Sequence, residues 1–231
     1  MSINILIIVP ARAGSKGVVN KNMYPVLGKP LIGYTLELLS ELPYDYCITT
    51  DDDKIINYAK HLNLDIHFKR PGELAADETK MIGVLIHAIN SMEKIKHKRY
   101  TYILLLQPTA PLRSVKDIEA CIELMKGRTT DSVISVNQVD SHHPILMKKI
   151  ENGYLEPFCI EELEGTRRQD YSPKAYMRNG AIYLAKRDNI VDSHSLWGNK
   201  IVPYVMDQNS SVSIDNLIDI QLLESVLTLE A

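Results

Sequence analysis

Between residues 5 and 136, continuous apolar runs alternate with segments in which apolar residues recur at helical spacing. Continuous runs are typical of strands buried on both faces, and the helical spacing is typical of helices that bury one face. Strands are predicted over 5–9, 46–50, 65–68, 102–106 and 132–136. Helices are predicted over 31–42, 54–62, 79–94 and 115–125. This order predicts an α/β fold with a doubly wound, mostly parallel sheet, in which ligands bind at the carboxyl ends of the strands.

The alternation ends after residue 136, and the next stretch has a different character. Residues 138–178 hold a His-His-Pro sequence, a hairpin-type turn near 151–153 and a polar run over 161–168. We interpret 138–178 as an insertion with its own strands, placed in a core made of 1–137 and 179–231. In the second part of this core, strands are predicted over 181–184 and 201–205, and a helix over 217–229.

Three short polar motifs are interpreted as local structure. Asp51-Asp52-Asp53 suits either a metal cluster or a helix cap with solvated neighbours, and we favour the cap. Ser114 is expected to cap the helix over 115–125. His142-His143 has no third ligand at metal spacing nearby, so it is interpreted as a turn leading into a proline.

The composition is that of a globular protein without a global charge bias. The chain has 231 residues, enough for one large domain, with 45% hydrophobic and 24% charged residues. A net charge of −3 gives no indication of a nucleic-acid or anionic-membrane partner, so any anion site must be local. No apolar run is long enough to predict a membrane span, and the N-terminal run is interpreted as a first strand and not a signal peptide. Three widely separated cysteines indicate reduced thiols, so we expect a cytoplasmic protein.

The loop after the first strand, "VPARAGSKGVVNKN", carries more charge and more glycine than a connector needs. Gly14 and Gly17 allow the backbone to approach a ligand closely, and successive N–H groups can form an anion-binding nest. Arg12, Lys16 and Lys21 add the positive charge that a triphosphate requires. The spacing matches neither the dinucleotide fingerprint nor the P-loop. Taken alone, the loop is either a phosphate site or a solvated turn.

Further segments follow in a characteristic order: "GKPLIGYT", "RPGELAAD", "LQPTAPLR", "RRQD" and "RNGAIYL". Together with "PARAGSKGVVNKN" they resemble the acylneuraminate cytidylyltransferases (CMP-sialic acid synthetases) and their legionaminic and pseudaminic acid relatives, nearly end to end. The resemblance implies a nucleotidyltransferase, Rossmann-like fold. It also implies a reaction in which the anomeric hydroxyl of a nonulosonic acid attacks the α-phosphate of CTP, with Mg²⁺ (or Mn²⁺), to give a CMP-sugar and pyrophosphate.

The resemblance also implies which residues bind the nucleotide. They are Ala11, Arg12, Ala13, Gly14, Ser15, Lys16, Lys21, Asn22, Arg70 and Asp77. Lys21 is expected to hold the α-phosphate, and Arg70 with the backbone after Asp77 to read the cytosine. Without the resemblance, Arg70 would be interpreted as a surface arginine before a Pro-Gly turn. The expected catalytic residues are Arg12, Lys16, Lys21, Gln107 and Asp215.

For the sugar, the resemblance implies Gln107, Lys148, Arg168, Asn179 and Tyr183. Arg168 is expected to grip the sugar carboxylate, for which a bidentate guanidinium is well suited. Alternatives remain: Gln107 as a cap of the next loop, Tyr183 as a core residue, and the adjacent Lys149 in place of Lys148. In the family the insertion crosses to the other subunit, so a homodimer is implied, in which Lys148 and Arg168 complete the partner's site.

The chain departs from the family pattern at two places. Where relatives carry Asp-x-Asp for the metal, this chain has Ser213 and Asp215, so Asp215 alone is expected to bind Mg²⁺. Asp219 is a substitute ligand or a helix-face carboxylate. Met81 replaces a small polar residue near the base. The identity of the sugar stays open, and the alternatives are a Kdo-type cytidylyltransferase or a nucleotide- or CMP-sugar-binding regulator without turnover.

Overall fold

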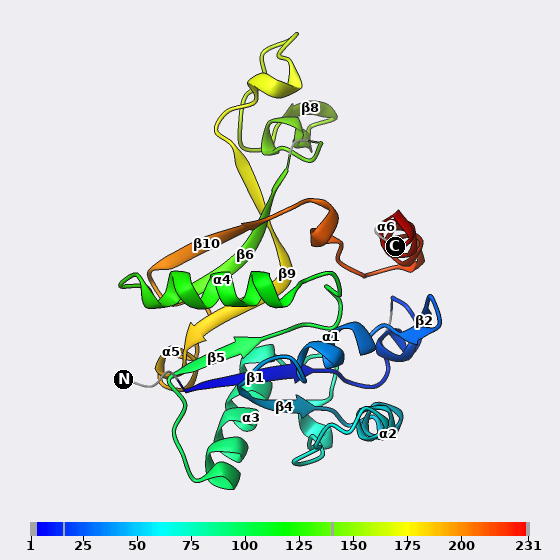
Figure 1. Ribbon diagram of the computed structural model, residues 1–231. Helices are drawn as coiled ribbons and strands as arrows, with labels where there is room; N and C mark the ends of the chain where they lie inside the picture. Colours follow the sequence, from blue (N-terminus) through cyan, green and yellow to red (C-terminus); the bar gives the residue numbers. More distant parts are fainter. Residues whose placement is uncertain (1–3, 16, 140, 230–231) are drawn as a thin grey trace.

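The computed structural model describes residues 4–15, 17–139 and 141–229, and its centre is a six-stranded sheet of order β10-β6-β9-β5-β1-β4 (Figure 1). The strands are β1 (Ile5–Pro10), β4 (Asp45–Thr49), β5 (Tyr102–Leu105), β6 (Ser132–Val139), β9 (Ala175–Lys186) and β10 (Ile201–Met206). β1 pairs in parallel with β4 and β5, and β6 with β10. β9 runs antiparallel between β5 and β6. The prediction of a mostly parallel sheet is confirmed, with β9 as the exception within this sheet.

The alternation of side chains along β1 explains why helices cover both faces of the sheet. Ile5, Ile7 and Val9 pack on one face, whereas Leu6 and Ile8 pack on the other. The first face is covered by α1 (Gly33–Leu38), α2 (Asp53–His61) and α4 (Val115–Lys126), and the second by α3 (Met81–Lys96) and α5 (Arg187–Val191). Since every residue of β1 is buried, its continuous apolar run was a correct signal of a doubly covered strand.

A third, smaller apolar cluster lies beside the sheet. It joins the short strand β2 (Pro25–Val26) and Leu31, which follows β3 (Lys29–Pro30), to the last helix, α6 (Leu217–Leu229). Single-turn helices complete the elements: η1 (Lys21–Met23), η2 (Gly72–Leu74), η3 (Pro144–Leu146), η4 (Arg168–Asp170) and η5 (Asn209–Ser211). No helix among the described residues is long and apolar enough to cross a membrane.

The predicted insertion is an arm that extends away from the sheet (Figure 1). β6 and β9 continue beyond the sheet as a ribbon, with Gln138 opposite Tyr176, after a register shift between Ile134 and Val136. The ribbon carries the hairpin of β7 (Lys148–Glu151) and β8 (Tyr154–Pro157), whose turn lies at the predicted position, residues 152–153. The boundaries 137/138 and 178/179 fall within this ribbon, and the division into core and insertion stays a prediction.

The local predictions are mostly confirmed. Asp52 accepts the N–H of Lys54 at 2.8 Å and caps α2. Ser114 forms a capping box with the first turn of α4. His143 accepts the N–H of Ile145 through Nδ1, so the His-His-Pro sequence is a structural turn.

One predicted strand is wrong. Residues 65–68 form no ladder, although the segment passes close to β4. The N–H of Asp65 donates to the hydroxyl of Tyr46, and the N–H of Arg70 donates to the carbonyl of Thr50. A short run of β-prone residues cannot by itself specify pairing, because strand formation depends on the neighbouring backbone. The helix expected over 31–42 is also shorter, covering Gly33–Leu38.

Candidate active site

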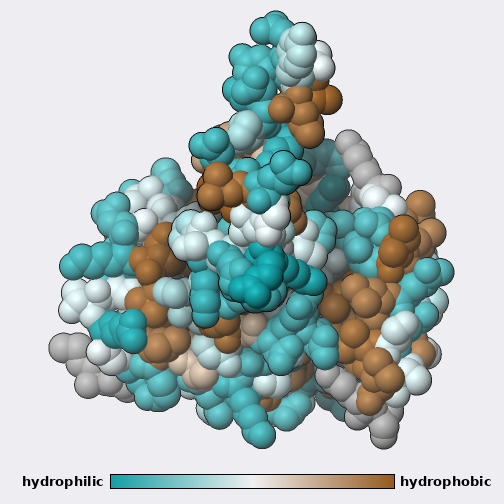
Figure 2. Space-filling view, turned by 90° about the horizontal axis from the view of Figure 1, so that it is seen from above, coloured by the Kyte–Doolittle hydropathy of each residue, from teal (hydrophilic) through white to brown (hydrophobic). Residues whose placement is uncertain are grey.

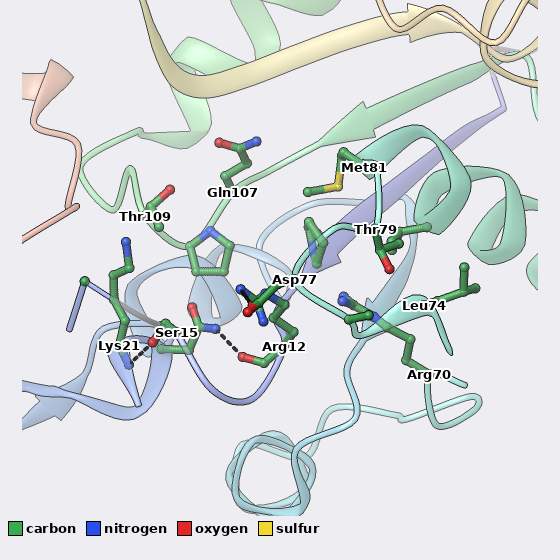
Figure 3. A pocket seen from close by; sticks show the side chains of 16 residues that line it. Arg12, Ser15, Lys21, Arg70, Leu74, Asp77, Thr79, Met81, Gln107 and Thr109 are labelled. Atoms are coloured by element: carbon green, nitrogen blue, oxygen red, sulfur yellow. Dashed lines mark hydrogen bonds and ion pairs between the residues drawn. The ribbon is translucent and has the colours of Figure 1, made fainter. Parts of the chain in front are cut away.

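A cavity of about 350 Å³ opens at the carboxyl ends of β1 and β5. Three segments line it: the loop after β1, the segment from Arg70 into α3, and residues 107–109 after β5. Figure 3 shows the side chains of Arg12, Ser15 and Lys21 on one side, those of Arg70 and Thr79 on the other, and Gln107 beyond them. The loop after β1 and residues 107–109 follow neighbouring parallel strands, which brings them together at one edge of the sheet. The segment from Arg70 follows no strand, and it reaches this edge through the N–H of Arg70, which donates to the carbonyl of Thr50, directly after β4.

Seven of the expected site residues line this cavity: Arg12, Ser15, Lys21, Asn22, Arg70, Asp77 and Gln107. Ala11, Ala13 and Gly14 belong to the same loop but do not line it. Lys16 lies outside the described residues. Met81 also lines the cavity, and its place near the base stays a prediction.

The loop after β1 is held by its own side chains. Ser15 donates through Oγ to the carbonyl of Val18 at 2.6 Å and accepts the N–H of Lys21 at 2.8 Å. Asn22 donates through Nδ2 to the carbonyl of Arg12 at 3.2 Å. Gly14 has a φ of +68°, a conformation that favours glycine. These bonds fold the loop back on itself, so the ammonium and guanidinium groups are arranged around one space.

Asp51 is a further support of this loop, which sequence reasoning missed. Its Oδ1 accepts the N–H of Ala13 at 3.0 Å. Its neighbours have other roles, because Asp52 caps α2 and Asp53 pairs with Lys69 at 2.6 Å. The carboxylates are therefore used for loop placement, capping and a surface ion pair. The position of Asp51 after a predicted strand indicated a place near the site. The sequence alone did not show which of the three aspartates binds the loop and which caps the helix.

Arg12 and Arg70 bring positive charge to the cavity in different ways. Arg12 forms an ion pair with Asp77 at 2.7 Å, which links the two loops that face each other. Arg70 is buried, and its guanidinium donates to Oγ1 and to the carbonyl of Thr49. Burial lowers the pKa of Arg70, and the nearby Asp51 opposes that shift. The interpretation of Arg70 as a surface arginine is wrong.

Lys21 connects the loop to the C-terminal segment. Its Nζ donates to the carbonyl of Ile214 at 2.8 Å and lies 3.3 Å from Oδ1 of Asp215. The same segment presses against Gly17, where an added Cβ would lie 2.3 Å from the carbonyl oxygen of Asp215. The second glycine of the loop is thus required by close backbone packing, and Asp215 is delivered to the edge of the cavity.

Asp215 is the exposed carboxylate at this edge, with 81% of its side chain accessible. Asp219 has a different role, since its Oδ2 accepts the N–H groups of Asp215 and Asn216 at the start of α6. Ser213 is exposed between the buried Val212 and Ile214. Among the described residues, no group of three or more His, Cys, Asp or Glu side chains is arranged to hold a metal ion.

Gln107 leaves β5 at the rim of the cavity, and its Oε1 lies close to Gly180, where a Cβ would be 3.2 Å away. Asn179 is buried: its Oδ1 accepts from Ser135 at 2.6 Å, and its Nδ2 donates to Ser211 at 2.9 Å. Tyr183 belongs to the apolar core of the second sheet face. Neither Asn179 nor Tyr183 lines the 350 Å³ cavity, so their sugar-binding roles stay predictions.

The expected site residues of the arm lie elsewhere. Arg168 lines a separate cavity of about 410 Å³ on the arm, together with His143 and Lys174. Lys148 pairs with Glu162 at 2.9 Å, whereas the adjacent Lys149 pairs with a carboxylate within its own hairpin. A single chain does not bring Lys148 and Arg168 to the cavity at β1 and β5.

Comparison with known proteins agrees with this geometry. The chain is 31% identical to an N-acylneuraminate cytidylyltransferase of Escherichia coli over 96% of its own length, but spans only 52% of that relative. It is 30% identical to the CMP-N,N'-diacetyllegionaminic acid synthase of Legionella pneumophila, covering 97% of both chains.

Among solved structures, CMP:2-keto-3-deoxy-manno-octonic acid synthetase complexed with CTP has the same fold. The TM-score is 0.69 at 14% identity, over 99% of this chain and 100% of the other. The cytidylyltransferase family model matches residues 6–224, which span both parts of the sheet, the arm and the cavity. This chain therefore belongs to the cytidylyltransferase family of nucleotidyltransferases.

Proposed function

We propose that this protein joins CTP to a nine-carbon 2-keto acid sugar of the sialic type, giving a CMP-sugar and pyrophosphate. The main support is the cavity at the ends of β1 and β5, where Arg12, Lys21, Arg70 and Gln107 meet around one space. Arg12 and Lys21 suit the phosphates, Arg70 is assigned to the cytosine, and Gln107 offers an amide to a hydroxylated acceptor. The legionaminic acid synthase, matched over 97% of both chains, makes the sialic-type sugars the first substrates to test.

In the proposed reaction the anomeric oxygen of the sugar forms a bond to the α-phosphorus of CTP. The bond between the α-phosphorus and the bridging oxygen breaks, and pyrophosphate leaves with that electron pair. The hydroxyl proton of the sugar passes to solvent. Such a transfer needs mainly positioning and charge stabilisation, and Lys21 is the side chain that we assign to the α-phosphate.

Mg²⁺ (or Mn²⁺) is part of this proposal, with Asp215 as its protein ligand. The fit is adequate, because Mg²⁺ commonly takes one or two carboxylates and completes its shell with phosphates and water. Asp215 does not line the cavity, but its exposed carboxylate lies 3.3 Å from Nζ of Lys21, which does, and a triphosphate would supply the remaining oxygens. A metal bound there would neutralise charge on the phosphates. Ser213 offers a neutral hydroxyl and is a weaker ligand than a second carboxylate.

We also propose a homodimer in which the arm reaches the partner's site. Apolar side chains reach the surface at several places among hydrophilic ones (Figure 2). On the arm, Ile150, Tyr154, Leu155, Phe158 and Leu163 are all more than 60% exposed. Large exposed apolar groups of this kind are typical of surfaces that are covered by a partner. Arg168 would then bind the carboxylate of a sugar held by the other subunit. For the whole protein we propose a reducing compartment such as the cytoplasm.

The test is pyrophosphate release with CTP and Mg²⁺ against N-acetylneuraminic, N,N'-diacetyllegionaminic and pseudaminic acids, with Kdo as a further acceptor. We expect release with a nine-carbon acid above the rate with CTP alone. Release only with Kdo would replace the acceptor in this proposal. Absence of release with all acceptors, while CTP still binds, would instead support a nucleotide- or CMP-sugar-binding regulator. The observation that favours this alternative is Ser213, which stands where relatives carry a metal-site aspartate.

A further inference from the structure

Arg113 carries a charge beneath the floor of the site, although it does not line the cavity. It is 3% exposed. Its guanidinium donates through Nη2 to the carbonyl of Gln107, through Nε to the carbonyl of Ala181 at 2.7 Å, and through Nη1 to the hydroxyl of Thr35 at 2.8 Å. All three acceptors are neutral. Burial lowers the pKa of Arg113 to about 9, so it still carries its charge at neutral pH.

The three acceptors belong to three different elements. Gln107 follows β5, Ala181 lies in β9 and Thr35 lies in α1. A guanidinium holds its donors in one rigid plane, so these bonds fix the three elements relative to one another. Packing alone would be served better by an apolar side chain, because a buried cation without a carboxylate partner costs free energy. The hydrogen bonds therefore indicate a geometric role for Arg113.

The side-chain amide of Gln107 lies close to the backbone at Gly180. The φ of Gly180 is +75°, and a Cβ at this position would lie 3.2 Å from Oε1 of Gln107. The next N–H in β9, that of Ala181, donates to Oδ1 of Asn179 at 3.2 Å. Arg113 thus binds the backbone carbonyls of both Gln107 and Ala181. The side-chain amide of Gln107 lies close to Gly180, the neighbour of Ala181.

We infer that Arg113 is a positioning residue for Gln107, setting the place of its amide relative to the acceptor sugar. This inference rests on the proposed function, in which Gln107 meets the sugar. Of the three residues that Arg113 binds, Gln107 lines the cavity, whereas Ala181 and Thr35 do not. Arg12, Lys21 and Arg70 are held by other contacts. Replacing Arg113 is therefore expected to lower kcat/KM for the sugar and to leave KM for CTP unchanged.

The first test compares Arg113→Lys with Arg187→Lys. The lysine at 113 keeps the charge but cannot make the three bonds together. Arg187 is a matched control, since its side chain is 11% exposed and pairs with Glu93 at 3.0 Å. It lies at the opposite end of β5, where its N–H donates to the carbonyl of Thr101. Initial rates of pyrophosphate release are measured against the concentrations of sugar and of CTP, and the melting temperature of each variant is recorded.

For Arg113→Lys we expect kcat/KM for the sugar to fall about tenfold or more, because small displacements of a positioning group cost rate steeply. KM for CTP should stay at the wild-type value. Arg187→Lys should lower the melting temperature without changing kcat/KM for the sugar or KM for CTP. Equal losses for sugar and CTP in Arg113→Lys, or the same split in Arg187→Lys, would overturn the inference.

A crystal structure of Arg113→Lys gives a readout that is independent of the choice of sugar. We expect the amide of Gln107 to leave its position against Gly180, and an unmoved amide would overturn the inference even in an active enzyme. If the wild-type protein releases no pyrophosphate with any acceptor, the proposed function fails, and this comparison alone decides the role of Arg113.

A second variant reaches Gln107 without touching Arg113, in case Arg113→Lys does not fold. Gly180→Ala brings a Cβ against the amide of Gln107, and Gly28→Ala is its control, because Gly28 has a φ of +82° and no atom within 4 Å of its added Cβ. Both variants share the backbone strain. A loss of sugar use confined to Gly180→Ala supports the restraint of Gln107, and the same loss in both variants contradicts it.

Discussion

The replacement Lys21→Ala tests the central assignment, because its effects on rate and on stability are expected to differ widely. In the folded protein Lys21 donates to the carbonyl of Ile214 at 2.8 Å and lies 3.3 Å from Asp215, whose side chain is 81% exposed. An ion pair with such an exposed partner contributes about 0–1 kcal/mol. The hydrogen bond to Ile214 adds about 0.5–1.5 kcal/mol. The total loss of stability should therefore be about 0.5–2.5 kcal/mol.

For a chain of this length, a loss of about 1 kcal/mol lowers the melting temperature by roughly 2–4 °C. Loss of one positioned charge that stabilises the transferred phosphate is expected to reduce kcat about 10²–10³-fold, or roughly 3–4 kcal/mol of activation free energy. The chemical effect should thus exceed the stability effect even though one atom, Nζ, is responsible for both.

The measurement is pyrophosphate release at saturating CTP and sugar, together with thermal unfolding of the same preparations. Lys29→Ala is the matched control, because Lys29 forms an ion pair with Glu37 outside the cavity and should lose only stability. A Lys21→Ala enzyme within a few-fold of the wild-type kcat would refute the assignment. A drop in melting temperature far beyond the calculated range would show that Lys21 acts mainly through the C-terminal segment.

Three further predictions concern the arm, the metal and the C-terminal segment. Arg168→Ala should raise KM for the sugar far more than KM for CTP. Arg167→Ala, which loses a surface pair with Asp170, is the control, and equal losses for both substrates in Arg168→Ala would contradict the carboxylate role. Ser213→Asp should lower the Mg²⁺ concentration needed for half-maximal rate, and an unchanged titration would mean that the metal is not bound near Asp215. Gly17→Ala should displace Asp215, whose carbonyl oxygen would lie 2.3 Å from the new Cβ, costing about 1–3 kcal/mol of stability and weakening CTP binding; a wild-type melting curve and CTP affinity would disprove that packing.

The part of the site that the sequence predicted well is local. The loop after β1 combines its glycines and cations within a few residues, and its bonds from Ser15 and Asn22 are short-range as well. Parallel strands then guarantee that loops at their carboxyl ends share one edge of the sheet. For this reason Arg12, Lys21 and Gln107, which follow β1 and β5, line one cavity. Arg70 lines the same cavity, but it was expected there only from the family resemblance.

The strand predicted over 65–68 failed for a related reason. Its residues have suitable propensity, but they meet the edge strand β4 through side chains and through single bonds of Asp65 and Arg70, without a ladder of backbone hydrogen bonds. Pairing is a property of two backbones, and a short run describes only one of them. The reverse holds for β9, whose direction between β5 and β6 was not predicted, because the length and path of the arm decide it.

The residues that sequence reasoning missed, Asp51 and Arg113, are supports of the site and not part of its lining. Each has a local reading that is sufficient by itself: an aspartate before a helix suggests a cap, and an arginine before Ser114 suggests a solvated loop. Their actual partners, Ala13 for Asp51 and Ala181 for Arg113, are 38 and 68 residues away in the chain. Residues that touch a ligand carry recognisable chemistry, whereas residues that place them are identified only by contacts formed in the fold. Because Asp51 and Arg113 bind backbone groups, replacing either is expected to move the residues that line the site without changing which residues they are.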